Sequence, residues 1–400
     1  MKFFLFLYNF LLLPFELAFL LINKWKRGKG RGRNYKPERI TPGGIWIHAA
    51  SVGEVRAAEP LIKELKKIAE DKPVYISTLT PAGQETARNI KEVEDTFYYP
   101  FDLPISVYYL FQRLRPWRVV VMETELWPNL ISMGKKRSRI FLANGRLGIK
   151  KMPTYQKLHW LYRPLLQSFS ALCLQSREDG ERIESLGVGP DKFYFPGNLK
   201  LDGMEVLSRG EKENIIVGGS THPGEEEILL DIFENIRKEI PDLKLLLAPR
   251  HLDRVADVVE LAEKKGFGPG FWSKNELESP VTIMDVMGRL VEIYSRARLV
   301  FIGGSLVPKG GHNPLEALGK PLFFGPYMEN WQELVGLLCE ASLAFQVKNK
   351  EELFNRWEKY FREEGEEYHN LRQKAREFKE KNAGSARQTA TIIVQEKRKG

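Results

Sequence analysis

The sequence lacks the short motifs that would assign it to a redox, metal or ATPase class. Two of its 400 residues are cysteine, Cys173 and Cys339, and no CxxC or CxH spacing occurs. We therefore expect neither a disulfide framework nor a zinc site, and a reducing compartment fits. GxxxxGK[ST] and GxGxxG sequences are absent, which disfavours a Walker-type site and a dinucleotide redox site. The six histidines show no HxxxH spacing, so no metal site is predicted.

Acidic residues are missing from one stretch near the N-terminus. Seven Lys and Arg residues lie between positions 24 and 36 with no acid among them, and Lys397, Arg398 and Lys399 lie at the C-terminus. These terminal cations account for the formal net charge of +9, and the rest of the chain is nearly neutral. This distribution argues against a nucleic-acid surface on the folded body. It indicates terminal segments that lie near an anionic partner.

That partner is predicted to be a membrane. Residues 3–22 are apolar over about the length needed to cross a bilayer. Lys2 precedes them and no A-x-A cleavage site follows, so we expect an uncleaved anchor over 1–23 and a basic linker over 24–43. The basic linker places the body on the cytoplasmic side. Asn9, Pro14 and Glu16 interrupt the apolar stretch, and an interfacial or re-entrant helix remains the alternative to a transmembrane span.

From Gly44 onward, strand patterns alternate with helix patterns. This alternation predicts an α/β fold of parallel sheets with helices on both faces. The strand candidates of the first half are Ile45–Ala49, Val74–Leu79, Arg118–Met122, Arg139–Asn144 and Ala171–Gln175. Those of the second half are Ile215–Gly219, Lys244–Ala248, Val281–Met284, Leu299–Ile302, Pro321–Phe324 and Leu343–Val347. We predict two Rossmann-like doubly wound domains, over 44–205 and 206–375, and a C-terminal helical segment over 376–400 that crosses back to the first.

Acidic side chains follow two strands of the first half, where ligands bind in doubly wound sheets. Glu54 stands three residues after Ser51, which is either a capping box or the position of a general base in a first helical turn. In the second interpretation the helix dipole favours the ionised carboxylate. Glu123 and Glu125 follow Met122, and the local sequence does not decide which of them acts. A cation also follows each of several strands: Arg146, Lys200 and Arg250. Together with Lys309 they suit an anionic substrate.

The segment Gly303–Pro321 contains five glycines after a strand pattern. A helix is predicted to begin at Asn313, with Pro314 at its first position and Glu316 at capping-box spacing. A glycine loop before a helix N-terminus is typical of a phosphate site, and a tight, well-capped turn is the alternative. Gly218–His222 is predicted to be a second glycine turn into a capped helix, and a further helix is expected to start at Asp285–Leu290. We expect Ser220, Thr221 and His312 to contact the same ligand.

Four motifs resemble one family. The segments His48–Ile62, Glu123–Asn129, Gly197–Asp202 and Gly303–Ala317 are similar to those of 3-deoxy-D-manno-octulosonic acid (Kdo) transferases. The resemblance implies the GT-B fold, in which two Rossmann-like domains face a cleft, with an N-terminal membrane-anchor helix. It also implies transfer of Kdo from CMP-Kdo to a lipid A precursor at the cytoplasmic face of the inner membrane.

Residue roles follow from the same resemblance. It implies that Glu54 is the catalytic base and that Glu123 and Lys200 stabilise the transition state. It places the CMP-binding segments at Pro249-Arg250, Gly288-Arg289-Leu290 and Asn313-Pro314-Leu315-Glu316. CMP-Kdo is then a substrate, and neither a cofactor nor a metal is expected. A membrane-associated GT-B transferase with a UDP-sugar donor and a nucleotide-binding scaffold without turnover are the alternatives.

Overall fold

The computed structural model describes residues 2–28, 41–202, 204–207, 213–363 and 369–396. The chain divides into two compact units, Met1–Gly203 with Asn382–Gly400 (unit 1) and Met204–Lys381 (unit 2). The sequence predicts a domain boundary between residues 205 and 206, which is two residues after the one in the structure. Most of the expected basic linker, residues 29–40, lies outside the described residues, as do 208–212 at the domain junction and the terminal cations of 397–400.

Unit 1 contains a parallel seven-stranded sheet in the order β3-β2-β1-β4-β5-β6-β7. Side chains of neighbouring strand residues enter two different cores: Trp46 packs in one and Ile47 in the other. Both faces are therefore covered, which explains why the strands are apolar throughout rather than alternating. The strands are β1 (Ile45–His48), β2 (Val74–Thr78), β3 (Asp95–Tyr98), β4 (Arg118–Met122), β5 (Ile140–Gly145), β6 (Ala171–Leu174) and β7 (Phe193–Tyr194).

Unit 2 contains a second parallel sheet in the order β10-β11-β9-β8-β12-β13-β14. Its strands are β8 (Ile215–Thr221), β9 (Lys244–Pro249), β10 (Gly270–Phe271), β11 (Val281–Ile283), β12 (Leu299–Ile302), β13 (Leu322–Phe324) and β14 (Phe345–Gln346). The short strands β3, β7 and β10 were not predicted. β7 and β10 have two residues each, and β3 begins with Asp95, so neither length nor alternation marks them.

The helices of unit 1 are α1 (Lys2–Gly28), α2 (Val52–Ile68), α3 (Pro81–Arg88), α4 (Pro104–Leu114), α5 (Pro128–Arg137), α6 (Met152–Lys157), α7 (His159–Leu166), α8 (Arg177–Ser185), α9 (Leu199–Asp202) and α16 (Ser385–Gln395). Those of unit 2 are α10 (Glu225–Arg237), α11 (Val255–Lys264), α12 (Leu290–Arg296), α13 (Gln332–Glu340), α14 (Lys350–Arg362) and α15 (Leu371–Asn382).

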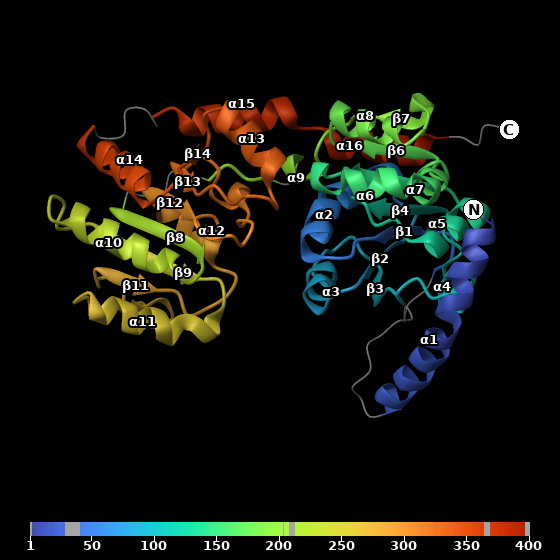
Figure 1. Ribbon diagram of the computed structural model, residues 1–400, viewed down its shortest axis with the longest axis horizontal. Helices are drawn as coiled ribbons and strands as arrows, with labels where there is room; N and C mark the ends of the chain where they lie inside the picture. Colours follow the sequence, from blue (N-terminus) through green and yellow to red (C-terminus); the bar gives the residue numbers. More distant parts are fainter. Residues whose placement is uncertain (1, 29–40, 203, 208–212, 364–368, 397–400) are drawn as a thin grey trace. The chain divides into compact units, whose positions relative to one another are not determined.

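The last helix of the chain belongs to the first unit. α16 (red in Figure 1) packs on α2 and α9, and Ala386, Ala390 and Ile393 enter the same core as Ile47. Asp202 caps its N-terminal end by accepting hydrogen bonds from the amides of Gly384 and Ala386. At the other end the Arg118 guanidinium donates to the Ile393 carbonyl at 2.9 Å. A carboxylate at the start and a cation at the end complement the helix dipole.

α1 (blue in Figure 1) lies along α4 of unit 1. Glu16, fully buried, accepts hydrogen bonds from the amides of Ile105 and Ser106 in the first turn of α4. Asn9 accepts one from the Asn129 side chain at 2.7 Å. The polar residues that interrupt the apolar stretch are thus the ones that attach α1 to the unit. Among the described residues no helix is long and apolar enough to cross a membrane, so the predicted transmembrane span is not confirmed.

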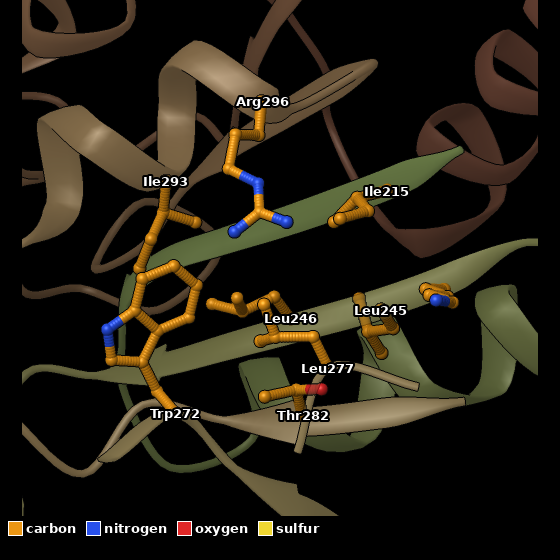
Figure 2. A pocket seen from close by; sticks show the side chains of 9 residues that line it. Ile215, Leu245, Leu246, Trp272, Leu277, Thr282, Ile293 and Arg296 are labelled. Atoms are coloured by element: carbon orange, nitrogen blue, oxygen red, sulfur yellow. The ribbon is translucent and has the colours of Figure 1, made fainter. Parts of the chain in front are cut away.

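A small cavity lies at the amino ends of β8 and β9, between Leu246, Ile293 and Trp272 (Figure 2). The Arg296 guanidinium lies over the Trp272 ring, 5.7 Å from its centroid, and forms part of the wall. The volume is about 10 Å³, which is room for one water molecule at most. This cavity is therefore a packing gap and not a ligand site.

Candidate active site

Each sheet has one topological switch point, where successive strands start to be added on the opposite side. In unit 1 it lies between β1 and β4, and in unit 2 between β8 and β12. Glu54 follows β1 and Glu123 follows β4, so the two carboxylates flank the crevice of unit 1. Ser220 and Thr221 end β8, and His312 follows β12. The sequence-predicted residues therefore gather at the edges where ligands bind in such folds.

Glu54 lies in the first turn of α2 with 8% of its surface exposed. Its carboxylate accepts hydrogen bonds from the Ala50 amide at 2.8 Å and the Ser51 hydroxyl at 3.1 Å. Burial, reinforced by the nearby Glu125 and Glu123, raises the pKa of Glu54 to about 8. The expectation that the helix end holds Glu54 ionised is therefore wrong, because desolvation outweighs the dipole and the two hydrogen bonds.

Glu123 and Glu125 have different partners. Glu123 has a left-handed backbone (φ 51°), and its Oε1 lies 2.7 Å from Lys200 Nζ. Its Oε2 lies 3.4 Å from Arg146 Nη2. Glu125 instead accepts a hydrogen bond from the Trp127 indole at 2.8 Å, and burial raises its pKa. Glu123 is thus the carboxylate that joins the two cations predicted to face the substrate.

Lys200 is positioned by a short helix that two polar residues hold. The Asn144 side chain at the end of β5 accepts a hydrogen bond from the Leu199 amide at 2.9 Å, which fixes the start of α9. Asp202 at the end of α9 caps α16. The buried Asn144 Nδ2 has no hydrogen-bond partner within the described part of the chain. An unsatisfied buried donor beside Lys200 is a candidate contact for a substrate oxygen.

In unit 2, three neighbouring strands bring together residues that were predicted to bind the nucleotide. The Arg250 amide after β9 donates to the Thr221 carbonyl at the end of β8 at 3.0 Å. His222, directly after β8, lies with its Nε2 3.0 Å from Nε2 of His312. The Thr221 hydroxyl is buried, and among the described residues it has no hydrogen-bond partner.

The glycines of Gly303–Pro321 are explained by close packing. A Cβ on Gly303 would lie 2.3 Å from the Ser220 carbonyl oxygen, and one on Gly311 would lie 2.1 Å from the Met328 sulfur. Gly304, Gly310 and Gly311 also have positive φ. Close packing and backbone conformation therefore explain the glycines of this segment, and no bound ligand is needed to explain them.

The first amides of this loop are already occupied. The buried carboxylate of Glu225 accepts hydrogen bonds from the amides of Gly304, Ser305 and Leu306 at 2.7, 2.9 and 2.9 Å, and from His222 at 3.0 Å. The start of the loop is therefore not the phosphate cradle that the sequence suggested. A ligand at this edge must be bound by side chains or by later amides.

The segment after Asn313 is one turn of 3₁₀ helix, Pro314–Ala317, and not the predicted α-helix. Asn313 still caps it, accepting from the Leu315 amide at 3.1 Å, and its side-chain amide donates to Glu316 at 3.3 Å. A single turn lacks the aligned peptides of a helix dipole, so the dipole argument for phosphate binding fails here. Leu318 directly after it is extended, which ends the helix.

Comparison with known proteins supports the resemblance. Residues 23–203 match a family model described as 3-deoxy-D-manno-octulosonic-acid transferase (kdotransferase). A 3-deoxy-D-manno-octulosonic acid transferase of Haemophilus influenzae is 34% identical over 334 residues, which cover 79% of this chain and 78% of that protein. The chain belongs to the Kdo transferase family.

A second relative is longer than this chain. A bifunctional glycosyltransferase/methyltransferase of Fusobacterium nucleatum is 35% identical over 333 residues, and the match spans 77% of this chain and about half, 51%, of that protein. The UDP-GlcNAc 2-epimerase of Neisseria meningitidis shares the fold, with a TM-score of 0.61 over 88% of this chain and 99% of that one. At 14% identity this likeness concerns the fold alone, two parallel α/β sheets of the GT-B type.

Two further sequence predictions for this Kdo transferase family member differ from the structure. Gly218 and Gly219 lie inside β8 instead of a turn, and a Cβ on Gly219 would lie 1.8 Å from the Tyr294 hydroxyl. α10 begins at Glu225 after Gly224, with no side-chain cap. The helix expected at Asp285 begins only at Leu290, because Gly288 has a positive φ of 82°. Arg289 is exposed just before it and pairs with Glu292 at 3.1 Å.

Two residues of the site were not singled out from the sequence. Asn144 lies two residues before Arg146, which was predicted as a strand-exit cation, and Glu225 is one of three consecutive acids in the first turn of α10. Asn followed by Gly at a strand exit was a usable sequence signal for Asn144, because Asn tolerates the positive φ that the structure has there. Three of the four amides that donate to Glu225 are about 80 residues away in the chain, so a local pattern does not show that Glu225 is the acid that binds them.

Proposed function

We propose that this protein transfers Kdo from CMP-Kdo to the lipid A precursor lipid IVA, by a metal-independent, inverting mechanism. Membership of the Kdo transferase family supports the Kdo part of this proposal. The observation that carries the chemistry is Glu54, a buried carboxyl group with a raised pKa at the switch point of unit 1. Paired with the Glu123–Lys200 contact at the same edge, it forms an acid-base site for an anionic substrate.

Glu54 is the proposed general base. A carboxylate with a pKa of about 8 accepts a proton much more readily than an ordinary glutamate, and near neutral pH a fraction of it is ionised. It takes the proton of the acceptor hydroxyl as the oxygen attacks the anomeric carbon of Kdo. The bond from that carbon to the phosphate oxygen breaks, and CMP leaves with the electron pair. Attack from the face opposite CMP inverts the anomeric centre.

Glu123, Lys200 and Arg146 are proposed to stabilise the charges of that step. The donor sugar carries a carboxylate, which the Lys200 ammonium and the Arg146 guanidinium suit. Glu123 lies between the two cations and holds both side chains in place. Its own negative charge stabilises the positive charge that develops on the sugar as CMP leaves.

Unit 2 is proposed to hold the donor nucleotide. Arg250 and His312, with the hydroxyls of Ser220 and Thr221, suit the phosphate, and Glu316 suits the ribose hydroxyls. Pro249, Gly288, Arg289, Leu290, Pro314 and Leu315 would complete the CMP-binding surface. Cations and hydrogen-bond donors of this kind stabilise a departing phosphate without a metal ion.

A membrane-associated GT-B transferase with a UDP-sugar donor is the alternative function. To separate the two, the protein is incubated with lipid IVA and either CMP-Kdo or a UDP-sugar, and the lipid is analysed by mass spectrometry. We expect the mass of the lipid to increase by that of Kdo when CMP-Kdo is the donor, and to stay unchanged with the UDP-sugar. Transfer from the UDP-sugar, or none from CMP-Kdo, would reject the proposed donor.

We also propose that α1 holds the protein on the cytoplasmic face of the inner membrane without crossing it. One side of α1 is attached to unit 1 through Tyr8, Asn9 and Glu16. The other exposes a stripe of large apolar side chains, Phe6, Phe10, Leu13, Leu17 and Leu21. The basic run that follows in the sequence suits anionic headgroups.

Vesicle flotation tests this attachment. Wild-type protein is expected to float with vesicles that contain phosphatidylglycerol and to bind less at high salt. Phe10→Glu should abolish flotation, while Ile149→Glu, a matched change at an exposed apolar residue elsewhere on unit 1, should not. Equal flotation of both variants would disprove a role for the α1 stripe.

A further inference from the structure

Three histidines meet at the switch point of unit 2. His251, His222 and His312 follow β9, β8 and β12, which are neighbours in the sheet. The Nε2 atoms of His222 and His312 are 3.0 Å apart, and the His251 ring packs edge-on against His222 with 5.9 Å between centroids. No group of three His, Cys, Asp or Glu in the described ranges could hold a metal ion, so this cluster calls for another explanation.

The His222–His312 contact is a hydrogen bond and not a face-to-face stack. The two rings are parallel within 4°, and their centroids are 5.2 Å apart, which is about the 3.0 Å Nε2–Nε2 distance plus the two ring radii, so the two nitrogens point at each other in a common plane. With Nε2 atoms at 3.0 Å, one nitrogen must donate its proton and the other must accept it. When both rings are neutral, they are opposite tautomers. One Nδ1 then carries a proton and the other does not.

The charges around this pair are mainly positive. Arg250 acts on His312, Lys309 acts on His222, and His251 acts on both. Arg254 also acts on His222, and its charge is offset by Glu226, whose carboxylate lies 2.8 Å away. The buried Glu225 carboxylate accepts the four backbone hydrogen bonds described above. Burial and the neighbouring cations lower the pKa of both histidines, that of His312 to about 4, so the pair is neutral without a ligand.

We infer that the His222–His312 pair takes up one proton when a phosphate dianion binds at this edge of unit 2. The inference rests on the proposed function, in which the phosphate belongs to CMP. The added proton occupies the remaining Nδ1, so both Nδ1 atoms become donors and the Nε2–H···Nε2 bond is kept. The pair then carries one positive charge, which matches the second charge of the phosphate. A further proton would break the bond between the rings, so uptake stops at one.

Calorimetry of CMP binding to the full chain measures this uptake directly. Titrations near pH 7.5, where CMP is a dianion, are repeated in buffers of different ionisation enthalpy, and the slope gives the number of protons taken up. We expect about half to one proton in the wild-type protein, by linkage. Tighter CMP binding at lower pH should accompany it.

His312→Asn and His222→Asn are each expected to bind CMP with no proton uptake. His159→Asn, on α7 of unit 1, is the matched control and should behave as wild type. Because a variant could fold poorly, nitrogen-15 NMR of the histidines in the wild-type protein is the second readout, and CMP should shift both Nδ1 signals toward the protonated state.

The outcomes separate this inference from the proposed function. CMP binding without proton uptake, or unchanged uptake in His312→Asn, overturns the shared-proton pair and leaves the donor proposal intact. Failure of the wild-type protein to bind CMP rejects both.

Discussion

At the scale of single residues, burial decides the chemistry of Glu54. A charged side chain near a helix N-terminus gains about 0.3–1 kcal/mol from the dipole. A pKa raised from 4.5 to about 8 corresponds to several times that free energy, in the opposite direction. The carboxyl that accepts hydrogen bonds at the start of α2 is therefore also the proposed general base, because its position there removes it from water.

We expect transfer to become faster as the pH rises toward 8. Only ionised Glu54 accepts a proton, and its pKa of about 8 means that kcat/KM should increase about tenfold per pH unit below that value. A pH profile between about 5.5 and 9 measures this. A plateau already reached near pH 5 would show that Glu54 has an ordinary pKa.

Glu54→Gln is expected to abolish transfer and to stabilise the fold in alkaline solution. The pKa of Glu54 is higher in the folded state than in the unfolded one, so the folded state binds an extra proton between about pH 4.5 and 8. The stabilisation of the folded state that comes from the neutral Glu54 carboxyl is fully present at low pH, and it is lost as the pH rises to about 8. Glutamine stays neutral, so urea unfolding near pH 8.5 should show a gain of roughly 1–3 kcal/mol, which shrinks toward pH 5. A loss of stability at both pH values would contradict burial as the cause.

Glu123→Gln and Glu125→Gln should differ in their effects. Glu123 contacts Lys200 and Arg146, whereas Glu125 contacts Trp127. We expect kcat to fall by about 10²–10³ for Glu123→Gln and by less than about tenfold for Glu125→Gln. Steady-state kinetics of both variants decides between them, and the reverse order would assign the role to Glu125.

At the scale of helices and strands, the C-terminal helix supports the site from outside it. Asp202 ends α9, which carries Lys200, and the same carboxylate caps α16. Gly197, just before α9, is in contact range of Ser385, since a Cβ there would lie 2.8 Å from its hydroxyl oxygen. The family motif Gly197–Asp202 therefore joins a site residue to the docking of the last helix.

Asp202→Ala should reduce both stability and turnover. Loss of an N-terminal cap costs about 1 kcal/mol, and release of α9 lets Lys200 leave Glu123. We expect a lower melting temperature and a fall in kcat with little change in the affinity for CMP. Asp191→Ala, an exposed acid of the same unit, is the control. Normal turnover in Asp202→Ala would mean that α9 keeps its position without α16.

At the scale of the whole molecule, each unit carries one switch point and one set of groups. The proposed acid-base residues lie in unit 1, and the residues proposed to bind the nucleotide lie in unit 2. Arg250→Ala in unit 2 is expected to weaken CMP binding at least about tenfold, because one charge-assisted contact to phosphate is worth about 1.5–3 kcal/mol. Lys200→Ala in unit 1 should bind CMP as tightly as wild type. Fluorescence or calorimetric titration measures both, and a large effect of Lys200→Ala would show that CMP depends on unit 1.

The sequence by itself determined the main strands, the division into two Rossmann-like halves and the residues that follow each strand. These properties depend on local hydrophobic runs and on turn residues, which a sequence shows directly. β4 (Arg118–Met122) and β12 (Leu299–Ile302) were predicted to the residue, because each is a short apolar run with clear ends.

Only the tertiary structure decided the chemistry of those residues. Crossover connections place β1 beside β4 and β8 beside β12, and so bring together side chains far apart in the chain. Burial raises the pKa of Glu54, Lys200 pairs with Glu123, and Glu225 accepts the hydrogen bonds of the glycine-loop amides. Desolvation and long-range hydrogen bonds depend on distance in space, which a local sequence pattern does not contain.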